Sequence, residues 1–279
     1  MTSPLDPTPR PLILAPDGSP AREPQAPRRQ RLPRVRRYSL LGIPSVMEAP
    51  PGVAYSTEPR LGICALSGRK LVCKDPDVVV AAECAGNALA ELVDIETTRW
   101  GVANESPEKV LFVSELEDYR DVMPYLRSGT VTNRDILDRL LVFDLWIVNY
   151  DRNDQSLVGR TLYSNRPGYI ELRVIDLEKA RILRGEGVLS AGMLDATHMR
   201  ASPELEAQAP RKPQTLDAMI ERICDLSADQ IRDALSRMQS EDEPSLFPSV
   251  PTLDVDRAVH ALVTRARDLP RLTTEALRG

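Results

Sequence analysis

Apolar and polar positions alternate in blocks along this chain, and the blocks predict where its strands and helices lie. Short apolar runs at 60–65 and 70–74, joined by Leu66-Ser67-Gly68-Arg69, predict a β-hairpin. From residue 77 to residue 93 the apolar positions recur with a helical period, and 109–116 is strand-like again. The first half of the chain therefore predicts a hairpin, a helix and a further strand.

Helical patterns dominate the second half of the chain. Residues 132–148 form a long apolar helix that Thr132 could open with a capping box, and strands at 161–163 and 169–175 predict a second hairpin that turns at 165–168. Three further helices are expected at 215–224, at 228–239 with Ser227 and Gln230 as a capping box, and at 253–269. Less regular segments are expected at 117–129 with one short helix, at 149–160, at 185–213 and at 241–251. Strands followed by helices are typical of an α+β fold.

The first 37 residues differ from the rest in composition. They contain nine prolines and eight arginines and few apolar groups that could offset the entropy of ordering, so this tail is expected to be disordered. Its end, Arg36-Arg37-Tyr38-Ser39, is either a solvated basic segment or a place where Ser39 is phosphorylated or a partner docks. We expect a tail at 1–37, a strand-rich N-lobe at 38–118 and a helical C-lobe at 119–279.

Charge is distributed unevenly between the tail and the remainder. The chain has a formal net charge of −5, and eight arginines against three acidic residues give the tail +5, so the remainder carries −10. Nucleic-acid binding depends on clustered Lys and Arg. The acidic body is therefore not expected to bind nucleic acid, whereas the basic tail could contact a polyanion.

The four cysteines and two histidines do not form a recognisable metal site. The cysteines have neither CxxC spacing nor a neighbouring histidine, and the histidines lie far apart at 198 and 260. No signal peptide is evident, and no apolar run approaches the roughly 20 residues that span a bilayer. This pattern predicts a cytoplasmic chain without a membrane segment.

Candidate chemistry is concentrated where the helix at 132–148 ends. Its last residues, Phe143 to Val148, are apolar on nearly every side, and a cluster of Asn and Asp that includes Asp151 follows at once. The strand that ends at Ile175 then delivers Asp176. A buried helix that ends in several polar groups indicates a functional site.

Two charged residues earlier in the chain complete a set that suits phosphoryl transfer. That reaction uses a Lys on phosphate oxygens, a Glu that orients the Lys, a carboxylate that takes the hydroxyl proton, and oxygen ligands for Mg²⁺. The set of candidates in chain order is Lys74 at a strand end, Glu83 on the next helix, Asp151 in a loop and Asp176 after a strand.

Each of these residues has an ordinary explanation when it is taken alone. Lys74 and Glu83 could be surface residues. Asp151 could form a helix-end ion pair with Arg152, and Asp176 could pair within its own turn. Their order and their elements together favour a site over these separate explanations.

The stretch Phe-Asp-Leu-Trp-Ile-Val-Asn-Tyr-Asp-Arg at 143–152 resembles the catalytic segment of HipA-like kinases, and is distantly similar to that of phosphatidylinositol 3/4-kinases. Val174-Ile175-Asp176 resembles the family's metal-binding Ile-Asp, and Leu71-Val72-Cys73-Lys74 followed by Glu83 resembles its lysine strand and helix. The resemblance spans roughly 55–240. It implies a two-lobed protein-kinase-like fold that transfers the γ-phosphate of ATP, with Mg²⁺, to a protein Ser or Thr.

The resemblance also implies a role for each matched residue. Asp151 would be the catalytic base and Asp176 a Mg²⁺ ligand, while Lys74 would bind phosphate and pair with Glu83.

Two further nucleotide contacts are expected from the neighbouring strands. Ser67 and Gly68 form the one candidate for a glycine-containing phosphate loop. The backbone of Glu115 and Leu116 lies where a hinge strand would bind adenine.

The chain departs from the family pattern in the loop itself. Ser156 stands where such kinases carry a second metal-binding Asn, and Asp154 or Gln155 could supply the missing oxygen; Asn153 replaces a common His. Three hypotheses follow: an active kinase with a protein substrate, a pseudokinase or scaffold of the same fold that binds a regulatory partner, or a helical regulatory or capsid-associated protein with accidental similarity.

Overall fold

A computed structural model of the chain describes residues 35–47, 58–106, 109–118, 121–162, 168–183, 202–236 and 254–278. Outside these ranges lie residues 1–34, most of the turn at 165–168, most of segment 185–213 and all of 241–251. The predictions made for those residues stay predictions.

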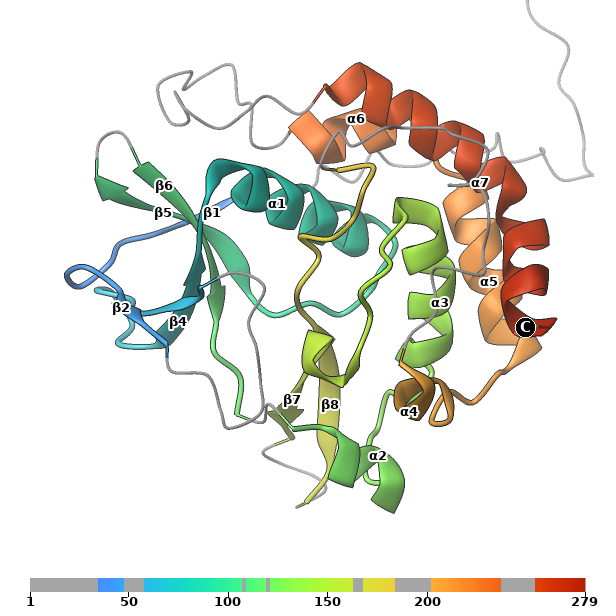
Figure 1. Cartoon of the computed structure of the whole chain (residues 1–279), viewed down its shortest axis with the longest axis horizontal. Coiled ribbons are helices and arrows are strands. Elements are labelled where there is room, and N and C mark those ends of the chain that lie inside the picture. The colour runs from blue at the N-terminus through green and yellow to red at the C-terminus, as the bar shows by residue number, and fades with distance from the viewer. Residues whose placement is uncertain are drawn as a thin grey trace, which may run out of the picture. The chain divides into compact units, whose positions relative to one another are not determined.

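The N-terminal region forms a six-stranded sheet (Figure 1). Its strands are β1 (Arg36–Tyr38), β2 (Ser45–Val46), β3 (Arg60–Ile63), β4 (Lys70–Lys74), β5 (Trp100–Ser106) and β6 (Lys109–Glu115). They lie in the order β1-β5-β6-β4-β3-β2, with β1 parallel to β5 and the other neighbours antiparallel. A core of Leu71, Cys73, Leu111 and Val113 covers one face of the central strands.

The hairpin predicted at 60–65 and 70–74 and the strand at 109–116 are confirmed as β3, β4 and β6. Strand β5 was missed, because Gly, Asn, Glu and Ser are weak strand formers. It is stabilised by pairing with β1 on one side and β6 on the other. Gly101 is required in it, since a Cβ there would lie 2.2 Å from the Arg36 carbonyl oxygen of β1.

The helix predicted at 77–93 is confirmed as α1 (Asp77–Leu92), which packs against β5 and β6 on one side and against α6 (Ala228–Ser236) on the other. Every residue from Val79 to Ala90 is buried, and these include the polar Glu83 and Asn87. A helix enclosed in this way can hold polar side chains only where they find partners.

The C-terminal region is mainly helical. Its helices besides α6 are α2 (Met123–Ser128), α3 (Ile136–Ile147), α4 (Pro203–Glu206), α5 (Pro213–Cys224) and α7 (Val255–Arg278). Helix α3 packs against α5 and α7 (Figure 1), and after it come the 3-10 turn η1 (Asp154–Ser156) and a two-stranded sheet of β7 (Leu157–Thr161) and β8 (Ile170–Val174). The described residues thus form an α+β fold, as predicted.

Some boundaries differ from the predicted ones. Strand β7 begins at Leu157, inside the segment that was expected to be a loop to 160. Helix α3 begins at Ile136, and Thr132 does not cap it, because the Thr132 hydroxyl donates to the Ile170 carbonyl oxygen at 3.3 Å instead. The capping box of Ser227 and Gln230 is confirmed by reciprocal bonds of 2.9 and 3.2 Å.

Two hydrogen bonds with α7 hold the C-terminal end of α3 in place. The Trp146 indole donates to the Leu262 carbonyl oxygen at 3.0 Å, and the buried Arg265 guanidinium donates to the Leu145 carbonyl oxygen. The second bond satisfies one of the carbonyl groups that the end of a helix leaves free. Val148 then ends the helix with φ of 59°, a left-handed conformation that is costly for a β-branched residue.

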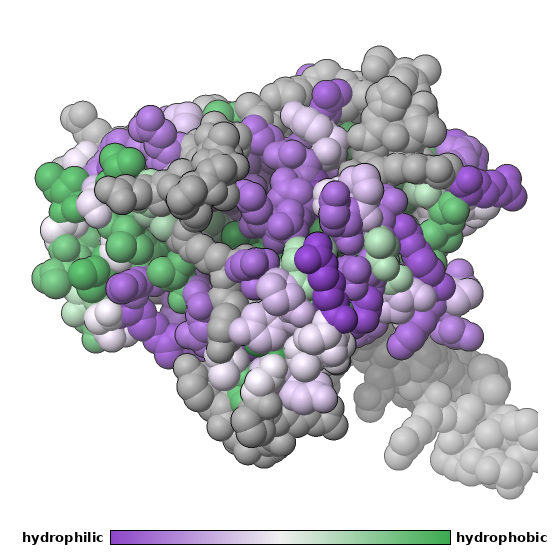
Figure 2. All heavy atoms as spheres, turned by 60° about the horizontal axis from the view of Figure 1, so that its bottom comes forward, coloured by the Kyte–Doolittle hydropathy of each residue, from purple (hydrophilic) through white to green (hydrophobic). Residues whose placement is uncertain are grey.

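Exposed large apolar side chains gather at the end of the sheet formed by β2 and the β3–β4 turn. They are Leu41, Ile43, Val46, Ile63 and Leu66, and Figure 2 shows an apolar area on this side of the molecule. Among the described residues, no helix combines the length and apolar character that crossing a bilayer requires.

Candidate active site

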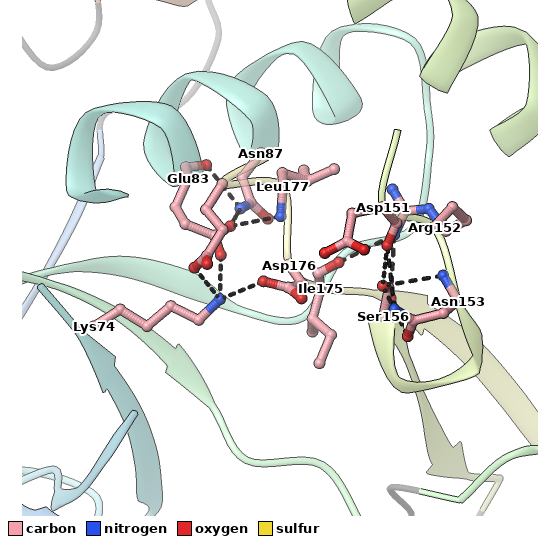
Figure 3. A network of polar contacts seen from close by, with 11 residues as sticks. Lys74, Glu83, Asn87, Asp151, Arg152, Asn153, Ser156, Ile175, Asp176 and Leu177 are labelled. Atoms are coloured by element: carbon pink, nitrogen blue, oxygen red, sulfur yellow. Dashed lines mark hydrogen bonds and ion pairs between the residues drawn. The ribbon is translucent and has the colours of Figure 1, made fainter. Parts of the chain in front are cut away.

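Lys74, at the end of β4, lies at the centre of a cluster of three carboxylates (Figure 3). Its Nζ is 2.5 Å from Glu83 Oε1, 2.8 Å from Asp176 Oδ1 and 3.0 Å from Glu178 Oε2. Glu83 comes from α1, whereas Asp176 and Glu178 follow β8. The ammonium group of Lys74 thereby connects the sheet, α1 and the segment after β8.

Glu83 is held on α1 by more than its ion pair. Its Oε2 accepts the Leu177 backbone N–H at 3.1 Å, and the Asn87 amide, one helical turn later, lies 3.4 Å from the same oxygen. Gly86 lets α1 approach this segment, because a Cβ there would lie 2.6 Å from Leu177 Cβ. Helix α1 therefore positions both Glu83 and the backbone beside Asp176.

Burial and charge act in opposite directions on the groups of the cluster. Burial by itself lowers the pKa of the Lys74 ammonium, but Glu83, Asp176 and Glu178 outweigh it and hold that pKa well above its ordinary value. Burial raises the pKa of Glu83 in spite of Lys74. Burial also tends to raise the pKa of Asp176, but Lys74 outweighs it and holds that pKa below its ordinary value.

Asp151 lies in a loop whose shape is fixed by its own polar groups. The Asn153 side chain accepts the Gln155 backbone N–H at 2.9 Å, and the Ser156 hydroxyl donates to the Asp151 carbonyl oxygen at 3.3 Å and accepts the Asn153 N–H at 3.4 Å. These bonds form a capping box at the start of η1. The loop leaves the Asp151 carboxylate free to face Asp176 (Figure 3).

Asp151 and Asp176 influence each other electrostatically. The pKa of Asp151 is raised from its ordinary value, first by partial burial and next by the negative charge of Asp176. Lys179 and Arg152 act in the opposite direction without cancelling the effect. A carboxyl group with a raised pKa beside a second carboxylate is typical of a site that moves a proton.

A second ionic network, made by Asp144, Arg152 and Asn149, fixes the ends of the loop. Arg152 Nε and Nη2 donate to the two Asp144 carboxylate oxygens at 2.8 and 2.9 Å, and the Asn149 amide donates to the same group at 2.9 Å. Arg152 Nη1 donates to the carbonyl oxygens of Ser156 and Ile175 at 3.3 and 3.2 Å. This guanidinium therefore ties the end of α3 to the residue before Asp176.

Asp176 has a left-handed backbone with φ of 64°. Asp adopts this region more readily than β-branched residues do, but it remains uncommon outside turns. Backbone strain of this kind is concentrated at functional sites, where the surrounding contacts hold it. Here the Lys74 ion pair and the Leu177–Glu83 hydrogen bond lie on either side of the strained residue.

The carboxylates of the cluster suit a divalent cation. Oxygen atoms of Glu83, Asp176 and Glu178 lie within 4.8 Å of one another, and this is the one such group among the described residues. Three carboxylates against one ammonium leave a formal excess of negative charge when all are ionised. Hard oxygen ligands with excess negative charge are what Mg²⁺ prefers.

The structure separates two predicted nucleotide contacts from this cluster. Ser67 and Gly68 form the β3–β4 turn beside Lys70, at the opposite end of β4 from Lys74. Lys70 and Lys74 are roughly 14 Å apart along the strand. Ser67 and Gly68 are therefore not brought to Lys74. Because Arg60 pairs with Cys73, the part of the chain that approaches Lys74 is the one that enters β3.

The other predicted site residues either form hydrogen bonds within the fold or lie outside the carboxylate cluster. The N–H groups of Glu115 and Leu116 already donate to the carbonyl oxygens of Arg99 and Lys70, at 2.7 and 2.9 Å, so they do not present free donors to adenine. Ser156 is fully buried and its hydroxyl serves the loop. Asp154 begins η1 and does not belong to the carboxylate group around Lys74.

Two acidic residues of the site, Glu178 and Asp144, are not among those that the sequence predicts for it. Glu178 follows Asp176 by two positions with an apolar residue between them, and this second acidic position beside Asp176 is the signal that points to it. Asp144 was read only as part of a motif. A charge inside an apolar helix needs a buried partner, and that signal could have identified Arg152.

Comparisons with known proteins add fold-level context. No protein-family model and no curated protein matches the chain. Among solved structures it is similar to the proinflammatory kinase CtkA of Helicobacter pylori, at 9% identity over 85% of this chain and 97% of that chain, with a TM-score of 0.48. It is also similar to the HipA, HipB and operator DNA complex of a Shewanella oneidensis MR-1 toxin–antitoxin system, at 14% identity over 83% of this chain and 67% of that chain, with a TM-score of 0.45.

Proposed function

We propose that the chain is a HipA-like, protein-kinase-like phosphotransferase that moves the γ-phosphate of ATP to a Ser or Thr hydroxyl of a protein. One observation carries the proposal: Lys74 Nζ pairs both with Glu83 of α1 and with Asp176, 102 positions later, while Asp151 faces Asp176. A lysine, its orienting glutamate and two separate acids in one place are the groups that phosphoryl transfer requires.

The chain's own residues supply the steps as follows. Lys74 holds phosphate oxygens, and Glu83 keeps its ammonium in place on α1. Asp151 accepts the proton of the acceptor hydroxyl as its oxygen bonds to the γ-phosphorus and the bond from that phosphorus to the β-phosphate oxygen breaks, which releases ADP. The raised pKa of Asp151 makes it a better base than an ordinary Asp. Arg152 holds the loop so that Asp151 stays opposite Asp176.

Asp176 and Glu178 are the residues that would hold Mg²⁺. The ion would neutralise charge on the phosphate oxygens when it is bound. The fit rests on the close group of carboxylate oxygens and not on Ser156, whose hydroxyl is engaged in the loop.

The proposal is tested by incubating the purified chain with labelled ATP and Mg²⁺ in the presence of a protein extract whose own kinases have been heat-inactivated. Wild type should label protein, and Asp151→Ala and Asp176→Asn should reduce labelling roughly 100-fold or more. Asp154→Ala, which removes a carboxylate from the same loop but from outside the cluster, should retain it. Absence of both labelling and an ATP-dependent rise in Tm in wild type would refute the proposal.

A second candidate function, a non-catalytic scaffold of the same fold, is favoured by one observation. Ser156 replaces a metal-binding Asn and its hydroxyl is bonded within the loop. Such a scaffold would keep its partner in Asp151→Ala and lose it when residues 1–34, the part of the tail that precedes β1, are deleted. Quantitative co-purification with both variants separates it from the active kinase.

A further inference from the structure

A polar cavity of about 450 Å³ lies apart from the Lys74 cluster. Residues from β1, the end of α1, the α1–β5 connection, β7 and β8 line it, and neither Lys74, Glu83, Asp151 nor Asp176 is among them. Nothing in the proposed phosphotransferase reaction uses it. Its volume falls in the range of small-molecule binding pockets.

Four arginines from separate segments converge on this cavity. They are Arg36 of β1, Arg99 before β5, Arg160 of β7 and Arg173 of β8. Arg99 and Arg36 are exposed, whereas Arg160 and Arg173 are half-buried. Guanidinium groups that gather in one place repel each other unless an anion lies between them.

The acidic residues of the cavity are largely engaged elsewhere. Glu91 accepts the Trp100 indole N–H at 2.8 Å, Glu96 pairs with Arg139 at 2.8 Å, and Asp94 pairs with Arg222. Glu117 remains, and burial raises the pKa of its carboxyl group, although Arg160 and Arg173 act in the opposite direction. The cavity therefore has more cationic groups than anionic groups to balance them.

The arginines, in contrast, have unused donors. Within the described part of the chain, Arg99 and Arg160 form neither an ion pair nor a side-chain hydrogen bond. Arg173 pairs with Glu171 at 2.7 Å, yet its Nε is buried without an acceptor. A buried guanidinium N–H without an acceptor is costly, so Arg173, which lines the cavity, has a donor left to offer to an anion.

We infer that the cavity binds a phosphate monoester carried by a phosphorylated peptide side chain. A doubly charged group with three terminal oxygens can accept from several guanidinium groups at once, which a carboxylate with two oxygens cannot do equally well. The Thr97 and Thr98 residues that line the same cavity add hydroxyl donors. The cavity exceeds the size of a single phosphate group, so the phosphate is attached to a larger molecule.

Titration calorimetry on the full-length chain tests this inference. The probes are a phosphoserine hexapeptide, its unphosphorylated counterpart and inorganic phosphate. We expect the phosphopeptide to bind more tightly than inorganic phosphate and the unphosphorylated peptide not to bind. Arg99→Gln should weaken phosphopeptide binding about tenfold or more, since it removes a charged hydrogen bond, and Arg99→Gln/Arg160→Gln should abolish it.

Two matched variants separate the cavity from other sites. Arg271→Gln removes an equal charge from the exposed surface of α7 and should bind like wild type. Asp176→Asn alters the Lys74 cluster and should also bind like wild type, so the cavity can be confirmed even where phosphotransfer fails.

Three outcomes would overturn the inference. These are no phosphopeptide binding by wild type, equal affinity for free phosphate and phosphopeptide, or unchanged binding in Arg99→Gln. Because Arg99 is exposed, its substitution is not expected to unfold the chain, and thermal melting of each variant checks this.

Discussion

Two ionic networks flank the Asp151 loop, and they differ in the ratio of positive to negative groups. In the first, one ammonium at Lys74 faces the carboxylates of Glu83, Asp176 and Glu178. In the second, the guanidinium of Arg152 meets the single carboxylate of Asp144 in a two-point contact. Asp144 and Arg152 are 3% and 4% exposed, whereas the Asp176 side chain is 27% exposed.

The difference separates a structural pair from a functional cluster. A buried pair whose charges cancel and whose remaining donors reach carbonyl oxygens leaves nothing for a ligand to bind. A cluster with excess carboxylates that is open to solvent at Asp176 has oxygens to offer to a cation. Substitutions in the Asp144–Arg152 network should therefore affect stability, and substitutions in the Lys74 cluster should affect binding and activity.

The largest expected effect is on folding, from Asp144→Ala. The change leaves the buried Arg152 charge without its carboxylate, which should lower the free energy of unfolding by about 3–5 kcal/mol. Denaturant unfolding followed by circular dichroism measures this. Asp135→Ala removes the carboxylate of the more exposed Asp135–Arg139 pair on the same helix and should cost no more than about 1 kcal/mol.

A double variant tests the reason for that loss. Asp144→Ala/Arg152→Met removes both charges and should be more stable than Asp144→Ala alone, because no unpaired charge remains buried. Equal losses in the single and double variants would show that the Asp144 contact stabilises by packing and not by charge balance.

A smaller loss of stability is expected from Gly86→Ala. The new Cβ would lie 2.6 Å from Leu177 Cβ, so α1 and the segment after Asp176 must move apart, at a cost of about 1–3 kcal/mol. Because Glu83 lies on the same helix, the ATP-dependent rise in Tm should shrink as well. Ala90→Gly, elsewhere in the buried part of α1, changes the helix without adding a clash and should leave the nucleotide effect intact.

Glu178→Gln should affect stability least among the buried acids. Lys74 retains Glu83 and Asp176 as partners, and the cluster loses part of its excess negative charge, so the free energy of unfolding should fall by about 1 kcal/mol, less than in Asp144→Ala. The Mg²⁺-dependent part of the ATP thermal shift should be lost. Glu171→Gln, on β8 outside the cluster, is the matched control; an unchanged Mg²⁺ effect in Glu178→Gln would remove Glu178 from the metal site.

The smallest effect concerns pH. Asp151 acts as a base only when ionised, and its pKa is raised by burial and by Asp176, so labelling should rise with pH through a value above that of an ordinary Asp. Glu178 acts in the same direction as Asp176, while Lys179 and Arg152 oppose them. The initial rate of labelling, measured across the acidic range, gives the position of this acidic limb, the pH interval over which labelling rises.

Lys179→Gln sharpens the pH prediction. It removes a positive charge that favours ionised Asp151, so the acidic limb should move to still higher pH. Lys70→Gln, at the other end of β4 from Lys74, should not move it. A shift to lower pH in Lys179→Gln would contradict the assignment of the limb to Asp151.

Most of the local structure could be predicted from local pattern. The hairpin of β3 and β4, helix α1 and the apolar course of α3 follow from short-range periodicity, and the structure has all three. Strand β5 could not be predicted in this way, since its residues form weak strands and only its neighbours stabilise it. The contact of Thr132 with Ile170, in place of a helix cap, likewise depends on a residue 38 positions away.

The sequence by itself determined which charged groups are available and in which elements Lys74, Glu83, Asp151 and Asp176 lie. Only the tertiary structure decided which of them meet. It joined Glu178 to Lys74 and engaged the Ser156 hydroxyl inside the loop. The physical reason is that periodicity reports the face of one element, whereas ion pairs and metal ligands depend on distances between elements that packing alone fixes.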